Sequence, residues 1–254
     1  MLKRGNGGTF YVPVQRYQDG TRADNITDWA LTQFKKHYKS PVRPEPVEGS
    51  AARVKKASTS SARTVRVITK EAIFHYVYAV LHDPIYREKY ALNLKREFPR
   101  IPLYGETDAT FWQWAAWGEE LMALHIGYEN VAPAKLNRID TPDEKSRKNA
   151  GKTYAPKAML KADKEAGRIA LDTETTLTGI PAEAWEYKLG NRTALEWILD
   201  QYKEKKPKDP TIREKFDTYR FADYKEKVID LLMRVTTVSV RTQEIVGAMR
   251  VWKR

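Results

Sequence analysis

Two carboxylates and a lysine between residues 172 and 188 are the side chains that most readily suggest catalysis. Asp172 stands near the end of a predicted strand, and Glu186 and Lys188 lie on a candidate neighbouring strand. Carboxylates can hold Mg²⁺ and a lysine can orient an attacking water, so the trio would suit a metal-dependent nuclease. Acidic and basic residues are common in this chain, and chance easily supplies such a trio. A Mg²⁺-dependent nuclease is therefore the third of three hypotheses.

The sequence lacks other signatures of catalysis and metal binding. It contains no GxxxxGK[ST] phosphate loop and no Asn/Asp-Pro-Pro-aromatic run of an amine methyltransferase, and no strand and helix frame the glycines of residues 5–8. It has no cysteine, which excludes disulfides, a thiolate nucleophile and cysteine-ligated metals. The four histidines, His37, His75, His82 and His125, have no metal-ligand spacing. We predict no catalytic and no metal-binding residue, and leave open whether the chain is an enzyme.

The charge balance favours a polyanionic partner. Lysine and arginine number 45 against 33 aspartates and glutamates, which gives a formal net charge of +12 and a pI near 9.6. Each phosphate that lysine or arginine neutralises releases condensed counterions from a nucleic acid, so double-stranded DNA is an expected partner. Basic residues can also be merely solvated, and charge alone leaves this open.

No segment is long and apolar enough to cross a bilayer, which takes about 18 consecutive apolar residues or more. Residues 1–8, MLKRGNGG, lack the apolar segment of a secretory signal. We therefore expect no membrane partner and a cytoplasmic location.

Residues 68–102 predict a helical hairpin. Thr69 can cap the first helix, and Asp83 with Pro84 can open the second, because proline at the first helical position loses no helical hydrogen bond. Pro99 and Pro102 should end that helix at Phe98. Apolar residues recur at helical spacing in both halves: Ile73, Val77, Val80 and Leu81, then Tyr86, Tyr90, Leu94 and Phe98.

Before the hairpin, residues 10–14 (FYVPV) predict a strand, and residues 18–20 (QDG) a turn. Asn25 can cap a helix at about 26–38 with Trp29, Ala30 and Phe34 inward. Residues 40–67 are rich in Pro, Ser, Ala and Arg and have few large apolar side chains. We expect a flexible, basic loop there.

After the hairpin, Asp108 can cap a helix that ends before Gly127. Its tryptophans, Trp112, Trp114 and Trp117, could stack on bases, but their spacing follows the apolar face and favours a core role. Residues 130–166 read as a surface excursion. Residues 167–178 alternate like a strand, which should pair with a second strand near 185–189.

Thr193 and Glu196 fit a capping box at the start of a further helix. A basic loop at 203–215 and two more helices would close the chain, lined by residues 221–232 and 238–249. The sequence therefore predicts a helix-dominated α+β fold, with a helical hairpin and bundle packed with a small β-sheet.

Three passages resemble the C-terminal specificity domain of Type ISP restriction-modification enzymes and their helicase-like adenine methyltransferase relatives. They are HYVYAVLHDPIYREKYALNLKREFPRIP (75–102), FWQWAAWGEELMALHIGYE (111–129) and GIPAEAWEYKLGNRTALEWILDQY (179–202), in the family's order. The resemblance implies a DNA target-recognition domain that positions an adenine-specific methyltransferase on its site.

The resemblance also implies how the chain is divided. Methyltransferase and helicase modules lie upstream in this bacterial family, and the cleaving domain resembles a separate N-terminal module. We expect residues 1–39 to be the tail end of an upstream module, 40–67 to be an insertion, and 68–254 to be the specificity domain. The parent would use S-adenosylmethionine, ATP and Mg²⁺, and we expect none of them to bind this fragment.

A DNA reader must project long hydrogen-bond donors from a rigid support. Lys188, Asn191 and Arg192 stand just before the capped helix, and arginine can pair with guanine and asparagine with adenine. The alternatives are that Asn191 caps the turn and that Arg192 forms an ion pair with Glu196. The basic loop supplies further candidates for phosphate contact: Lys203, Lys205, Lys206, Lys208 and Arg213. The second hypothesis is a structural helical coupler of larger domains that does not read DNA.

Overall fold

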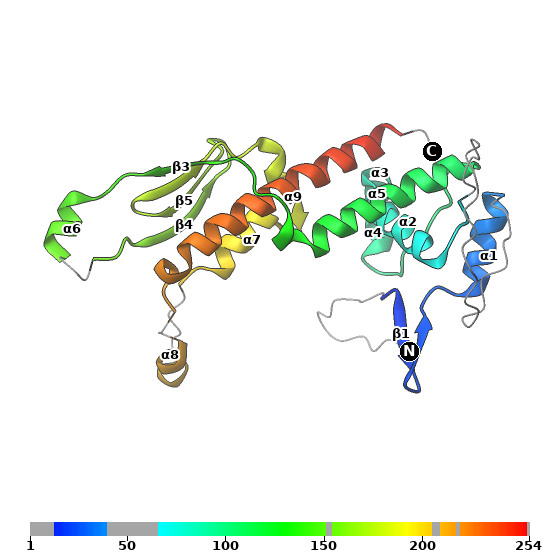
Figure 1. Cartoon of the computed structure of the whole chain (residues 1–254), viewed down its shortest axis with the longest axis horizontal. Coiled ribbons are helices and arrows are strands. Elements are labelled where there is room, and N and C mark those ends of the chain that lie inside the picture. The colour runs from blue at the N-terminus through cyan, green and yellow to red at the C-terminus, as the bar shows by residue number, and fades with distance from the viewer. Residues whose placement is uncertain (1–12, 40–65, 151–153, 205–208, 217–218, 253–254) are drawn as a thin grey trace, which may run out of the picture. The chain divides into compact units, whose positions relative to one another are not determined.

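The computed structural model describes residues 13–39, 66–150, 154–204, 209–216 and 219–252, and its chain separates into two compact units. Unit 1 comprises Met1–Leu121 with Trp252–Arg254, and unit 2 comprises Met122–Val251. Helices predominate in the described part, and the strands form small antiparallel sheets (Figure 1). The predicted helix-dominated α+β fold is confirmed.

Unit 1 begins with the antiparallel hairpin of β1 (Gln15–Gln18) and β2 (Thr21–Asp24). Its turn is the predicted Asp19-Gly20 pair, with φ of 51° and 78°, as two-residue hairpin turns of type I′ require. Most of the FYVPV segment lies outside the described residues.

Helix α1 (Asp28–His37) differs from its prediction at the cap and on one face. Thr27, not Asn25, accepts the hydrogen bond of the first turn, from the amide of Ala30. Leu31 and Phe34 are buried, whereas Trp29 is 72% exposed. The inward face is therefore turned away from Trp29.

The predicted helical hairpin is present, but its second half is broken. Helix α2 (Lys70–His82) is capped by Thr69, and Asp83 with Pro84 opens α3 (Pro84–Lys89), as predicted. Tyr90 interrupts the helix, and a short α4 (Ala91–Leu94) ends before Phe98. Tyr86 is buried, whereas the later members of the predicted stripe, Tyr90, Leu94 and Phe98, are partly or largely exposed.

Tyrosine hydroxyls fix the extended segment after α4. Tyr86 donates to the carbonyl of Arg100 at 3.0 Å, Tyr76 to that of Pro102 at 2.9 Å, and Tyr38 to that of Tyr104 at 3.0 Å. These alternate carbonyls face the aromatic core of unit 1. The Tyr104 hydroxyl in turn donates to the buried carboxylate of Asp83 at 2.7 Å.

Helix α5 (Asp108–Ile126) begins in unit 1 and supplies large side chains to its core. Phe111, Trp114 and Leu121 have no exposed surface. The core role of Trp114 is thus confirmed, while Trp112 and Trp117 are half-buried. Gly118 lies against the backbone of α2, where an added Cβ would be only 1.7 Å from the carbonyl oxygen of His75.

Unit 2 contains a four-stranded antiparallel sheet in the order β3-β6-β5-β4. The predicted surface excursion supplies its two edge strands, β3 (Asn137–Asp140) and β4 (Ala158–Asp163), with α6 (Glu144–Ala150) between them. The single strand predicted at 167–178 is two strands, β5 (Arg168–Asp172) and β6 (Thr175–Thr178), because the chain turns at residues 173–174.

The predicted second strand also has a different partner. A 3-10 helix (Ala182–Trp185) precedes β7 (Lys188–Leu189), which pairs with β8 (Arg192–Thr193) and not with β5. The capping box of Thr193 and Glu196 at α7 (Ala194–Gln201) is confirmed.

The predicted pair of closing helices is one helix, α9 (Lys225–Val251), preceded by a 3-10 turn (Phe221–Tyr224). Helix α8 (Pro210–Phe216) occupies part of the predicted basic loop. The core of unit 2 joins strands, α7 and α9 through Ile169, Leu171, Leu177, Leu195, Leu199, Val228 and Leu232.

The domain boundaries predicted at residues 39 and 67 stay predictions, and residues 40–65 lie outside the described residues. No helix among the described residues is long and apolar enough to cross a membrane.

Candidate nucleic-acid interface

The candidate base-reading residues lie on a tight hairpin that leads into α7. Strands β7 and β8 are joined by Gly190 and Asn191, and Gly190 has a φ of 73° at the first central position, where type II′ turns require glycine. Lys188, Asn191 and Arg192 are all exposed there. The structure therefore places the three predicted residues on one short projection.

The hairpin is supported by the helix that follows it. The Thr193 hydroxyl accepts from the Glu196 amide at 3.2 Å, and the Glu196 carboxylate accepts from the Thr193 amide at 2.9 Å. One turn on, the indole of Trp197 donates to the Leu189 carbonyl at 2.9 Å. These bonds fix the hairpin to α7, which is the rigid support that a reading element needs.

Arg192 forms an ion pair with Asp200 and not with Glu196, the partner that the sequence suggested. Its Nη1 lies 3.0 Å from Asp200 Oδ2, and its guanidinium carbon lies 6.0 Å from the centre of the Trp197 ring. Glu196 instead pairs with Lys164 at 2.8 Å, and this partner, with the Thr193 amide, lowers the pKa of Glu196. The Arg192 side chain remains 46% exposed, so it is oriented but accessible.

Lys203 lies near Arg192 on a concave surface of unit 2. The hollow also includes Leu160, which has a φ of 47° at a β-bulge of β4. The hollow is lined by Leu160, Ala162, Arg192, Glu196, Leu199, Asp200 and Lys203. Lys203, a candidate phosphate contact, and Arg192, a candidate base contact, thus line one surface together with Asp200.

The other predicted basic residues are only partly described. Arg213 is exposed on α8, and Lys205, Lys206 and Lys208 lie outside the described residues. Asp209 begins α8 by accepting from the amides of Thr211 and Ile212 at 2.8 and 3.0 Å. The segment is thus not a continuous loop.

The proposed nuclease trio is not assembled. The Asp172 side chain is 3% exposed; Oδ1 accepts from the amides of Glu174 and Thr175, and Oδ2 lies 2.8 Å from Lys225 Nζ. Glu186 and Lys188 belong to the separate β7–β8 region and not to a strand beside β5. Asp172 therefore connects the β5–β6 turn to the start of α9 (Lys225–Val251). Among the described residues, no group of three or more His, Asp or Glu could hold a metal ion.

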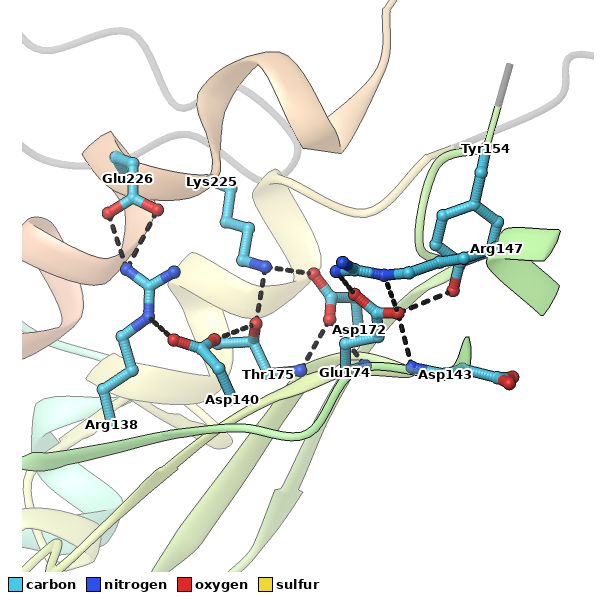
Figure 2. A network of polar contacts seen from close by, with 10 residues as sticks. All are labelled: Arg138, Asp140, Asp143, Arg147, Tyr154, Asp172, Glu174, Thr175, Lys225 and Glu226. Atoms are coloured by element: carbon cyan, nitrogen blue, oxygen red, sulfur yellow. Dashed lines mark hydrogen bonds and ion pairs between the residues drawn. The ribbon is translucent and has the colours of Figure 1, made fainter. Parts of the chain in front are cut away.

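A polar network that the sequence did not predict surrounds the β5–β6 turn (Figure 2). Lys225, at the start of α9, bonds Thr175 as well as Asp172, and Thr175 donates to Asp140 at 2.7 Å. Arg138 joins Asp140 to Glu226, with Nε and Nη1 each 2.8 Å from a carboxylate oxygen. This side of the network ties β3, the turn and α9 together.

The other side of the network centres on Glu174. Its carboxylate accepts from the Asp143 amide at 2.7 Å, from Tyr154 at 3.0 Å, and from Arg147 at 3.0 and 2.6 Å. Arg147 is the main cause that lowers the pKa of Glu174 to about 2. The sequence does not predict this network, because its members are spread from residue 138 to residue 226 without a regular spacing.

Comparison with known proteins gives the chain a family. Residues 1–231 match the family model of the Type ISP C-terminal specificity domain. No curated protein matches the chain. Among solved structures, the chain is similar to one described as a cryoEM structure of a DrdV–DNA complex, with 53% identity and a TM-score of 0.77, covering 96% of this chain and 22% of that one.

Two further structures are similar. The first is a nuclease-deletion mutant of the Type ISP restriction-modification enzyme LlaGI in complex with a DNA substrate mimic, with 31% identity, a TM-score of 0.54, and coverage of 75% of this chain and 17% of that one. The second, the ATP-dependent Type ISP enzyme LlaBIII bound to DNA, shares the fold at 23% identity and a TM-score of 0.61, with coverage of 92% and 13%. The chain thus spans about a fifth of these proteins or less. It belongs to the family of Type ISP C-terminal specificity domains.

Proposed function

We propose that this chain is a DNA target-recognition domain that places an adenine-specific methyltransferase over its site. The observation that carries the proposal is the family match over residues 1–231, joined to 53% identity with a protein whose structure is described as a DNA complex. The net charge of +12 agrees with a polyanionic partner.

In this proposal, the β7–β8 hairpin reads bases in the major groove. Arg192 and Lys188 would donate to guanine and Asn191 would pair with adenine, because these side chains match the groove edges of those bases. The ion pair with Asp200 and the contact with Trp197 support the proposal, since they hold the Arg192 guanidinium in place while nearly half of the side chain stays exposed.

In this proposal, the basic residues that follow α7 contact the phosphates of the duplex. Lys203 and Arg213 are exposed in the structure, and Lys205, Lys206 and Lys208 accompany them in the sequence. Such contacts fix the register of a protein on the duplex and carry no sequence information themselves.

We infer that the chain acts in the bacterial cytoplasm beside methyltransferase and helicase modules. S-adenosylmethionine, ATP and Mg²⁺ would be bound by those modules and not by this chain. The carboxylate of Asp172, the residue considered for Mg²⁺ in the sequence, is engaged by Lys225 and by two amides. Its donor set does not fit a Mg²⁺ site.

The test is binding of the whole chain to a fluorescent mixed-sequence duplex at increasing salt. We expect binding at low salt and a linear fall of log affinity with log salt concentration, because each phosphate contact releases counterions. Sequencing the duplexes retained from a randomised library should then yield a preferred site. No binding at low salt would favour the structural coupler, and salt-independent binding would contradict the phosphate contacts.

A further inference from the structure

A segment of unit 2 outside the predicted DNA-binding residues projects from the sheet without joining its core. Residues 141–150 and 154–157, here called the α6 arm, connect β3 to β4 and include α6, which Figure 1 shows beyond the end of the sheet. None of the described residues of the arm belongs to the apolar cluster that joins the sheet to α7 and α9. Apolar burial therefore does not account for the order of the arm.

The β5–β6 turn holds both ends of the α6 arm. Through its backbone, the Glu174 carbonyl accepts from the Thr141 amide at 2.7 Å, and the Thr173 amide donates to the Lys157 carbonyl at 3.1 Å. Through its side chain, Glu174 binds the Asp143 amide and Arg147 near the start of the arm, and the Tyr154 hydroxyl near its end (Figure 2).

The carboxylate of Glu174 is buried although it lies at the tip of a hairpin. The Glu174 side chain is only 5% exposed, and a buried charge is costly unless hydrogen bonds compensate it. Four bonds from three residues do so here. Asp143 continues the arrangement by accepting from the amide and the hydroxyl of Ser146, which fixes the first turn of α6.

The α6 arm presents cations to solvent. Lys148 and Lys157 are exposed, and the Arg147 side chain, although bound to Glu174, is 48% exposed. Ordering a polar segment costs conformational entropy, which the Glu174 contacts offset without any gain in core packing. A segment that is held by hydrogen bonds at both ends and carries exposed cations is suited to the regularly spaced phosphates of a duplex.

We propose that the α6 arm is a second DNA-contact surface and that Glu174 is the positioning residue that holds it. The inference rests on the proposed function and adds a surface separate from the β7–β8 hairpin and the basic residues after α7. Lys148 and Lys157 contact phosphates, and Glu174 acts through the arm without touching DNA.

The first experiment compares Glu174→Gln with Asp172→Asn in the full chain. Both substitutions remove one buried negative charge at the same turn, so overall electrostatics alone would strengthen DNA binding equally in both. Asparagine retains an oxygen that can accept from the amides of Glu174 and Thr175, so Asp172→Asn loses the Lys225 ion pair but keeps the arm in place.

The measurement is anisotropy of a fluorescent mixed-sequence duplex across a salt series, with folding of each variant checked by circular dichroism. We expect Glu174→Gln to bind several-fold more weakly than the wild type and with a smaller salt slope, and Asp172→Asn to bind at least as tightly as the wild type. Equal behaviour of the two variants, in either direction, would overturn the positioning role.

A surface variant tests the arm without disturbing the turn. Lys148→Ala with Lys157→Ala should lower the slope of log affinity against log salt concentration by about 2, roughly one for each lost phosphate contact. An unchanged slope would refute the DNA-contact surface. If the wild type itself failed to bind the duplex at low salt, the proposed function would fail instead, so the two failures are distinguishable.

Discussion

Arg192 is held by one anion and one aromatic ring, and this environment determines what its loss should do. The Asp200 carboxylate and the Trp197 ring orient the guanidinium, while the Thr193 cap secures the backbone beneath it. The Arg192 guanidinium is thus held in an orientation that suits a directional hydrogen bond to a base. A residue that only added charge would not need such support.

We predict that Arg192→Ala reduces sequence preference more than affinity. A paired arginine–guanine contact contributes about 1–3 kcal/mol of discrimination, so one base of the selected site should become less restricted. Sequencing of duplexes selected from a randomised library by the wild type and by the variant measures this. Equal losses on the selected and the mixed-sequence duplex would remove Arg192 from the reading residues.

Glu174 should make part of the stability acid-sensitive. Its pKa falls from 4.5 to about 2 in the folded chain, chiefly through Arg147. A lowered carboxylate pKa contributes stability that is complete above the unfolded value of 4.5 and is lost as the pH falls toward 2.

The corresponding prediction compares the wild type with Glu174→Gln in urea unfolding over that pH range. The wild type should be more stable at neutral pH, and the difference should shrink steadily below pH 4.5, since the variant cannot take up this proton. A stability difference that stays constant down to the lower pH would show that the carboxylate charge is not its cause.

At the scale of elements, α5 and α2 of unit 1 pack backbone against backbone at Gly118. The carbonyl oxygen of His75 occupies the space that a side chain at Gly118 would need, at 1.7 Å from an added Cβ. The sequence does not signal this contact, because Gly118 stands in a helical run between a tryptophan and two glutamates.

We predict that Gly118→Ala destabilises the protein by about 3 kcal/mol, the upper end of the cost of overpacking, because two helix backbones must separate. Gly247→Ala is the matched control, since Gly247 is also helical and nothing lies within 4 Å of its added Cβ. That variant should gain about 0.5–1 kcal/mol from its higher helix propensity. Chemical denaturation measures both, and a Gly118→Ala variant as stable as the wild type would contradict the contact.

The elements that the sequence predicted correctly depend on local signals. Thr69, the Asp83-Pro84 pair, and the Thr193 and Glu196 box each begin a helix with side chains and amides only a few residues apart. Asp209 and Pro210 give the same kind of signal at the start of α8. The prediction of a basic loop at residues 203–215 did not take this signal into account.

Errors arose where buried polar residues or distant partners decide the structure. The sequence predicted two closing helices, with a break between residues 232 and 238, whereas α9 continues through this interval and buries Val235 and Thr236 there. The Thr236 hydroxyl donates a hydrogen bond to the Leu232 carbonyl at 2.7 Å, within the same helix. The partner of β7 and the residues that hold Glu174 depend on contacts that sequence spacing does not encode.

At the scale of the whole molecule, family and charge answer different questions. The match over residues 1–231 assigns the chain to the Type ISP specificity domains, whereas a net charge of +12 would suit many proteins that bind polyanions. The family was predicted from three long passages of the sequence, at residues 75–102, 111–129 and 179–202. The contact residues on the β7–β8 hairpin stay predictions, because exposure and rigidity are necessary for reading DNA but occur in other proteins as well.

The last prediction separates a defined phosphate-binding surface from diffuse attraction by the excess charge. Two variants each lose two positive charges: Lys205→Ala with Lys206→Ala, after α7 in the sequence, and Lys35→Ala with Lys36→Ala, at the end of α1 in unit 1. Diffuse attraction depends on total charge, so it predicts equal losses of affinity for a mixed-sequence duplex.

A defined surface predicts unequal losses. The first variant should weaken all duplexes alike and lower the salt slope by about 2, because two counterion-releasing contacts disappear, whereas the α1 variant should keep the wild-type slope. Salt series on both variants and the wild type give the answer. Matching slopes for the two variants would mean that the basic residues after α7 attract DNA only through the charge that they add to the whole molecule.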